Sequence, residues 1–131
     1  MIYYMYNPEF DQEILDFMRG QNTSKSQAYP SITSTVYLFE VKNQTTGYMW
    51  LEIREEYVEL VEFFFKGSVK DMWRLYEFII GFSCRQSKPF LRIKLPDDDQ
   101  GSELIKRWGG EVVERDEKEL LIEIPFLSYQ E

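Results

Sequence analysis

The chain has 131 residues, of which 44% are hydrophobic and 17% aromatic, so it is long and apolar enough to fold around a core. Its net charge of −8 argues against non-specific binding to nucleic acid, which requires a positive field. Histidine is absent and cysteine occurs once, which excludes Ser-His-Asp and Cys-His catalysis, the usual zinc sites and an internal disulfide. No apolar run approaches the roughly 18 residues of a membrane span, so we expect a cytoplasmic protein.

The first part of the chain predicts a strand, a helix and a long loop. Met1–Tyr6 is a short aromatic segment typical of a strand. Asn7 is a suitable cap for a following helix, Pro8 suits its first position, and Gly20 is expected to end it. The segment Gln21–Thr35 is polar and rich in Ser and Thr, which predicts a loop. One face of the predicted helix carries Phe10, Ile14, Phe17 and Met18.

Three strands are expected next. Val36–Val41 and Tyr48–Ile53 alternate in polarity on either side of the turn-forming residues Lys42–Gly47, so they predict a hairpin. Tyr57–Phe65 is rich in aromatic and β-branched residues and ends in a continuous apolar run. This composition is typical of a central, well-covered strand.

A helix and a parallel strand are predicted after Lys66-Gly67. Ser68 and Asp71 have the spacing of a capping box at a helix N-terminus. Cys84 lies late in the apolar helix, where we expect a small buried side chain. The inward face of this helix is expected to hold Met72, Trp73, Tyr76, Ile79, Ile80 and Ser83. Pro89 ends the helix and Phe90–Leu95 follows as a strand.

The last part of the chain predicts a short helix and a hairpin. The acids after Pro96 suit a helix N-terminus, and no metal site is predicted there because neighbouring side chains on a strand or helix do not converge. The helix Ser102–Trp108 is expected to close at Gly109-Gly110. Glu111–Arg115 and Glu119–Pro125 form the predicted hairpin, and we expect residues 126–131 to be a loose tail.

We therefore predict a single-domain α/β (α+β) fold over residues 1–131, with a mixed central sheet in the order strand, helix, loop, three strands, helix, strand, helix, two strands. This order resembles the GNAT-type acyl-CoA N-acyltransferase superfamily. The resemblance rests on the hairpin Val36–Ile53, the strand–turn–helix Tyr57–Gln86 and the ending Glu103–Val113. In size and layout the chain also resembles the short, divergent acetyltransferase-like proteins of tailed phages, which implies the host cytoplasm if a phage encodes it.

The resemblance implies that acetyl-CoA or another acyl-CoA is the cofactor, and that its pyrophosphate binds the turn after the strand Tyr57–Phe65. Backbone N–H groups at a helix N-terminus suit a phosphate, and Lys66 and Lys70 add positive charge. The family motif begins with Gln or Arg, has Gly three positions later and has Gly or Ala two positions after that. With Lys66 at the first position, Val69 and Asp71 stand where the family has these two small residues. The expected cofactor-binding residues are Phe65, Lys66, Gly67, Ser68, Val69 and Lys70.

The resemblance also implies an acid on the first of the two parallel strands, which would deprotonate the amine through water. Glu62 or Glu59 would supply this catalytic group. The alternative is that both are ordinary strand side chains, paired with Arg92 and Lys94 in a structural ladder. A second open alternative concerns aromatic residues that either shape an acceptor pocket or pack the core: Tyr29, Tyr37, Tyr48 and Trp50.

Two main functions stay open. One is transfer of an acyl group from acyl-CoA to a primary amine. The other is a non-catalytic binding or structural module, such as a phage accessory or virion-associated protein acting through protein–protein contacts. The family's proton-donating tyrosine, four residues before the closing glycine, falls on Ile105 or Lys106, which favours the second.

The expected partner is an amine substrate or a protein. An oligomer is possible, and neither nucleic acid nor a membrane is expected to bind. A weaker third reading is an acidic mimic, marked by Glu52, Glu55, Glu56, Glu59 and Glu62.

Overall fold

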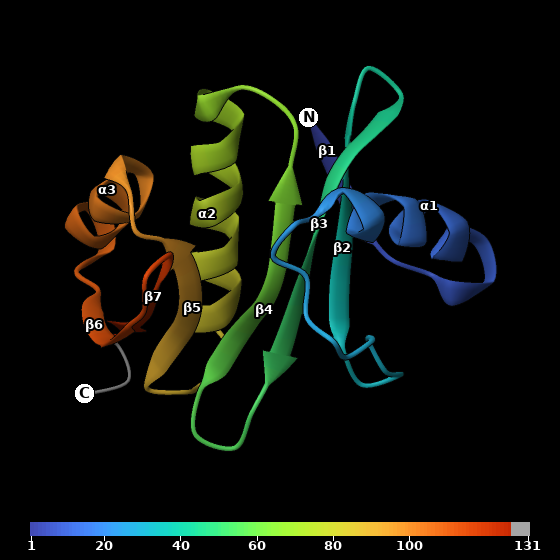
Figure 1. Cartoon of the computed structure of the whole chain (residues 1–131). Helices are drawn as coiled ribbons and strands as arrows, with labels where there is room; N and C mark the ends of the chain where they lie inside the picture. The colour runs from blue at the N-terminus through green and yellow to red at the C-terminus, as the bar shows by residue number, and fades with distance from the viewer. Residues whose placement is uncertain (127–131) are drawn as a thin grey trace. The chain divides into compact units, whose positions relative to one another are not determined.

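A computed structural model describes residues 1–126 of the chain. These residues form three helices and a seven-stranded mixed sheet with the strand order β1-β2-β3-β4-β5-β7-β6 (Figure 1). The predicted element order is confirmed. Along the chain the elements are β1 (Ile2–Met5), α1 (Pro8–Gln21), β2 (Thr35–Val41), β3 (Gln44–Ile53), β4 (Val58–Phe65), α2 (Val69–Cys84), β5 (Phe90–Pro96), α3 (Asp99–Trp108), β6 (Glu111–Arg115) and β7 (Glu119–Pro125).

Within this single domain the chain forms two compact units. The first consists of Met1–Glu52 with Val61–Glu77, and the second begins with Ile53–Leu60 and resumes at Phe78. Within residues 1–126, none of the helices has both the length and the apolar character that crossing a bilayer requires.

The first unit places a helix on each face of its strands. β1 pairs with β2 and β2 with β3, both antiparallel. On one face, Leu15 and Met18 of α1 pack against buried side chains of β2 and β3. On the other face, Phe63 of β4 stacks on Tyr76 of α2 with ring centroids 4.8 Å apart. Alternation along β4 produces this division, because successive side chains of a strand point to opposite faces.

The second unit contains the predicted parallel pair and the terminal hairpin. Val58–Leu60 at the start of β4 pairs in parallel with Leu91–Ile93 of β5. β7 pairs antiparallel with both β5 and β6, and α3 packs against β5 and β7. The Asp98 side chain caps α3 by accepting the Gly101 N–H, which explains one of the three consecutive aspartates. Phe126 is buried and its N–H donates to the Pro89 carbonyl, whereas the rest of the predicted tail lies outside the described residues.

Three local expectations are corrected. The turn between β2 and β3 is the pair Lys42 and Asn43, with φ of 52° and 64°, so β3 starts at Gln44 rather than Tyr48. Two successive positive φ values match the right-handed twist of a hairpin. Cys84 is exposed at the end of α2, whereas Ser83 before it is buried, as expected. Successive helical side chains point about 100° apart, which is enough to bury Ser83 and leave Cys84 in solvent.

α1 faces the core with only part of the side expected: Met18 is buried and Ile14 packs against the core cluster. Its buried residues are Leu15, Met18 and Arg19. Phe10 and Phe17, which share one face as predicted, point that face into solvent, where they are 81% and 63% exposed. The apolar spacing therefore identified the helix correctly but only half of the predicted inward residues.

Gly47 gives a direct test of the packing of β3. A Cβ at this position would lie 2.0 Å from the Phe64 carbonyl oxygen, a backbone atom that cannot move aside cheaply. We expect Gly47→Ala to lower the free energy of unfolding by about 3 kcal/mol. Urea denaturation measures the change. Gly20→Ala is the matched control, because nothing lies within 4 Å of a Cβ there, and it should gain about 0.5 to 1 kcal/mol from helix propensity. Equal effects at the two glycines would contradict the packing described.

Candidate functional site: a buried arginine–glutamate centre

A buried ion pair joins α1 to β4 in the first unit. The Glu62 residue is 3% exposed and the Arg19 residue 9%. Arg19 Nη2 lies 2.7 Å from Glu62 Oε2, and Arg19 Nε donates to Oε1 at 2.9 Å. The two parallel bonds form the planar, bidentate geometry that guanidinium and carboxylate groups favour.

Two further donors complete the shell of the carboxylate. The Tyr48 hydroxyl donates to Glu62 Oε1 at 2.7 Å, and the Ser26 backbone N–H donates to Oε2 at 2.8 Å. Asn22 Nδ2 in turn donates to the Tyr48 hydroxyl oxygen at 2.9 Å. Each oxygen of Glu62 therefore accepts two hydrogen bonds, so this carboxylate is fully occupied by protein groups.

The surroundings fix the ionised form of Glu62. Burial by itself raises the pKa of this carboxyl, but hydrogen bonds from Arg19, Tyr48 and the Ser26 N–H, with the charge of Arg19, outweigh it, and the net pKa lies below the usual value. Burial is the largest cause that raises the pKa of the Tyr48 hydroxyl, and its bond to Glu62 adds to it. The centre is thus a carboxylate, a guanidinium and a neutral phenol.

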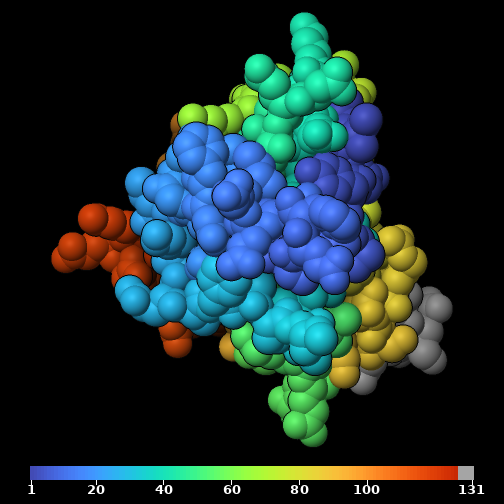
Figure 2. Space-filling view, turned by 90° about the vertical axis from the view of Figure 1, so that its right-hand side faces the viewer, coloured from blue at the N-terminus to red at the C-terminus, as the bar shows by residue number. Residues whose placement is uncertain are grey.

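Arg19 also holds the segment between α1 and β2, residues 22–34, which we call the α1–β2 segment. Its Nη2 donates to the carbonyl oxygens of Ala28 at 2.7 Å and Ser26 at 3.3 Å. The guanidinium carbon lies 5.1 Å from the ring centroid of Tyr29 and 5.8 Å from that of Trp50, within the range of cation–π attraction. Figure 2 shows the result: α1 (blue) and this segment (light blue to cyan) lie side by side.

The other end of the α1–β2 segment is held by a second carboxylate. The Ser34 hydroxyl and the Trp50 Nε1–H both donate to Glu52 Oε2. In the middle of the segment, the Tyr29 hydroxyl donates to Asp16 Oδ1 of α1 at 2.8 Å. The segment predicted as a loop therefore has no regular structure but is fixed at both ends and in the middle by side-chain hydrogen bonds.

The predicted cofactor turn lies at the start of α2, also in the first unit. Lys66 through Lys70 are all exposed and Phe65 is half-buried. The Ser68 cap is confirmed, because Ser68 Oγ accepts the Asp71 N–H at 3.1 Å. Asp71 lies 3.9 Å from Arg74, a weak ion pair that partly offsets its negative charge near the turn.

Glu59 lies in the second unit and is bound differently from Glu62. Arg54 donates from Nε at 3.0 Å and Nη2 at 2.8 Å to the same oxygen, Oε1, in a partly exposed pair. Glu59 stands opposite Arg92 in the parallel register, as the ladder hypothesis expected. Arg92, however, forms its ion pair with Glu123 at 2.7 Å and stacks 4.3 Å from the Tyr57 ring centroid. Glu62 takes no part in a ladder, since Arg19 holds it.

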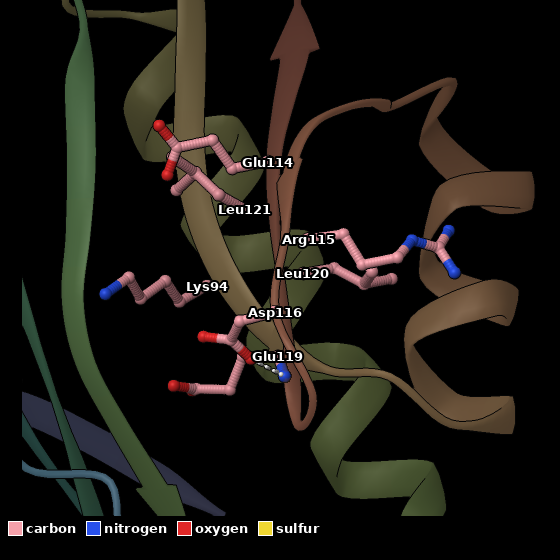
Figure 3. A pocket seen from close by; sticks show the side chains of 7 residues that line it. All are labelled: Lys94, Glu114, Arg115, Asp116, Glu119, Leu120 and Leu121. Carbon is pink, nitrogen blue, oxygen red and sulfur yellow. Dashed lines mark hydrogen bonds between the residues drawn. The ribbon is translucent and has the colours of Figure 1, made fainter.

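A small hollow lies on the terminal strands of the second unit. Figure 3 shows Lys94, Asp116 and Glu119 on one side of the hairpin, while Arg115 points the other way. Backbone N–H groups of Lys118 and Glu119 bond to Asp116 and lower the pKa of its carboxyl. This is the geometry of an ordinary hairpin turn. Within residues 1–126, no group of three or more acidic or cysteine side chains is placed to bind a metal ion.

Solved structures share this arrangement over nearly the whole chain. The ribosomal-protein-S18-alanine N-acetyltransferase from Escherichia coli matches with a TM-score of 0.77 at 8% identity, covering 95% of this chain and 93% of that one. Mutant forms of the spermidine/spermine N-acetyltransferase SpeG from Vibrio cholerae give 0.74 at 11% identity, covering 98% and 95%. A GNAT family acetyltransferase from Elizabethkingia anophelis with acetyl-CoA bound gives 0.63 at 11% identity, covering 95% and 97%. The chain has the GNAT-type N-acyltransferase fold.

The likeness to these GNAT proteins lies in the fold and not in the sequence. No family model and no curated protein matches the chain. At these identities the comparison establishes the arrangement of strands and helices, and the side chains of the site must be judged on their own geometry.

Sequence reasoning found Glu62 but missed its partners Arg19 and Tyr48. The signal available was the alternation of β4, where Glu62 stands on the same face as Val58 and Leu60, both of which are buried. A carboxylate at an inward position requires a cation or several donors, because burying it alone is costly. The alternation does not say which of the distant cations in the chain meets it. Of the aromatic residues weighed for an acceptor pocket, Tyr48 and Trp50 are buried in the core and Tyr29 is half-exposed beside Arg19.

Removing one member of the buried ion pair should lower the free energy of unfolding by more than the lost side-chain contacts alone would. Arg19→Met leaves Glu62 buried without its cation, and Glu62→Leu does the same to Arg19, so each should cost about 3 to 5 kcal/mol of unfolding free energy. The double variant should cost clearly less than the sum, because no unpaired charge remains. Arg54→Met with Glu59→Leu is the exposed control pair, with coupling of about 1 kcal/mol or less. Additive losses at Arg19 and Glu62 would refute the described pairing.

The lowered pKa of Glu62 predicts how stability depends on pH. In the unfolded chain the carboxyl titrates near a pKa of about 4.3, above its folded value. The stabilisation that comes from this pKa difference is complete at pH values above the unfolded pKa. It is lost as the pH falls through the folded pKa. Urea unfolding of wild type and Glu62→Gln from neutral to acidic pH should give a difference that is constant near neutrality and shrinks in acid. A difference that grows toward low pH would show that the folded pKa is raised instead.

Proposed function

We propose that the chain binds acyl-CoA through the turn Phe65–Lys70 at the start of α2 and transfers the acyl group to a primary amine. The observation that carries the proposal is this exposed, lysine-flanked turn in a chain whose fold matches, over 95% of its length, a protein that holds acetyl-CoA. The acceptor amine and the acyl group are left open by this observation.

The turn offers the groups that a pyrophosphate needs. The first N–H groups of any α-helix lack intrahelical acceptors and lie at the positive end of its dipole. In α2 these include the amides of Val69 and Lys70, flanked by the side chains of Lys66 and Lys70. The Lys66 N–H is already bonded to the Thr46 carbonyl at 2.8 Å, which fixes the turn against β3 without using the later amides.

The proposed reaction is direct attack of a neutral amine nitrogen on the thioester carbonyl. The new C–N bond forms, the C–S bond breaks, the sulfur leaves as thiolate and is protonated, and the amine loses one proton. Glu62 is a poor acceptor for that proton, since its lowered pKa and four hydrogen bonds hold it as a carboxylate. In this proposal Glu62 is a positioning residue that fixes the α1–β2 segment. Glu59 is the other acid that the resemblance implies for the proton, and Arg54 Nε and Nη2 donate to its Oε1.

Calorimetry with coenzyme A tests the binding step. The wild-type chain should bind with a dissociation constant in the micromolar range. Lys66→Ala and Lys70→Ala should each weaken binding about threefold to tenfold, since each removes one charge from a partly screened phosphate contact. Lys118→Ala, an exposed lysine of the terminal hairpin, is the control and should leave binding unchanged. Equal effects of all three lysines would indicate non-specific attraction rather than a site at the turn.

A second candidate is a binding module that keeps the fold without the chemistry. The observation that favours it is the occupied state of Glu62, together with Ile105 and Lys106 where the family's proton-donating tyrosine is expected. This candidate predicts no coenzyme A binding even at millimolar concentration in the same titration. The two functions are thus separated by one measurement on the unmodified chain.

A further inference from the structure

The outward face of α1 carries two large aromatic side chains with no packing role in the first unit's core. Phe10 is 81% exposed and Phe17 63% exposed. They are one heptad apart, so they lie on the same side of the helix about two turns from each other. Burying such side chains favours association, and exposed aromatic clusters of this kind mark interaction surfaces more often than single exposed residues do.

An acidic margin runs along one side of these aromatics. At 100° per residue, Glu9, Glu13 and Asp16 project from the helix on the same flank of the Phe10–Phe17 line. The cation of α1, Arg19, points to the opposite side and is paired with Glu62. The outward face of α1 is therefore aromatic and negative, and nothing on the helix balances its charge. Figure 2 looks onto the side of the molecule that α1 (blue) covers.

We propose that this face is a docking surface for a partner protein that presents an amphipathic helix with lysines or arginines beside its apolar stripe. Two anchors seven residues apart match the repeat of a second helix packed lengthwise on α1. Positive side chains on the partner complement Glu9 and Glu13, and the charge of Asp16, which also accepts the Tyr29 hydroxyl, adds to the negative field. A second copy of this chain is disfavoured, because the chain carries a net charge of −8 and an antiparallel two-fold contact would place the acids of both copies on the same side of the helix pair. An anionic membrane is disfavoured by the same charge.

A pair of synthetic helical peptides tests the surface on the full-length, isotope-labelled chain. One peptide has a leucine stripe flanked by lysines, and the other has the same stripe flanked by glutamates. The lysine peptide should bind saturably, shift backbone amide signals mainly in α1, and weaken with added salt. The glutamate peptide should bind at least tenfold more weakly.

Variants of the chain identify the contacts. Phe10→Ala and Phe17→Ala should each weaken the lysine peptide about tenfold or more, and Glu9→Gln with Glu13→Gln should weaken it severalfold and reduce the salt dependence. Because these side chains are exposed, the melting temperature should stay within about 2 °C of wild type. Val113→Ala is the control, an apolar residue of β6 that is 44% exposed.

The alternatives give different results. Equal binding of both peptides, or binding insensitive to Phe10 and Phe17, would overturn the proposal in favour of non-specific apolar contact. Concentration-dependent dimerisation that Phe17→Ala abolishes would assign the face to a second copy. Co-sedimentation with neutral phosphatidylcholine vesicles would assign it to lipid. Binding of neither peptide would also overturn it. None of these outcomes depends on whether the chain binds coenzyme A.

Discussion

The first unit depends on one interaction, the buried ion pair of Arg19 with Glu62. Burying two opposite charges is costly, and such a pair is tolerated only when the remaining donors and acceptors are also satisfied. Here they are: Tyr48 and the Ser26 N–H complete the carboxylate, and the Ser26 and Ala28 carbonyls receive the guanidinium. The pair therefore joins a helix, two strands and an irregular segment in a single network, and the position of each depends on the others.

The same network limits what the site can do. A carboxylate that must stay ionised to hold Arg19 is not poised to exchange a proton near neutral pH. The fold of an acyltransferase and a glutamate on β4 would by themselves suggest a catalytic base at Glu62, yet its surroundings give it a structural task. Any acyl transfer by this chain must place the proton elsewhere. The functional proposal therefore rests on the turn Phe65–Lys70, proposed to bind the cofactor, and not on Glu62.

α1 shows how one short helix can serve two purposes. Its inner side supplies Leu15, Met18 and the charge that holds Glu62. Its outer side presents Phe10 and Phe17, and neither contributes to the buried core. With apolar residues on both sides, the helix has no single apolar stripe from which the packed side could be read. The burial of a cation on the inner side is compatible with folding only because β4 brings a carboxylate to the same place.

The sequence by itself determined the order of the elements, the caps at Asn7 and Ser68, the parallel crossover and the terminal hairpin, because turn residues, capping spacing and alternation are local properties of the chain. It also placed Glu62 on a central strand. Tertiary structure alone decided which side of α1 is buried, that Arg19 meets Glu62 across 43 positions of sequence, and how residues 22–34 are held. These outcomes depend on which donors, acceptors and charges, distant in the sequence, bond to one another when they are buried. Local sequence patterns do not predict such pairing.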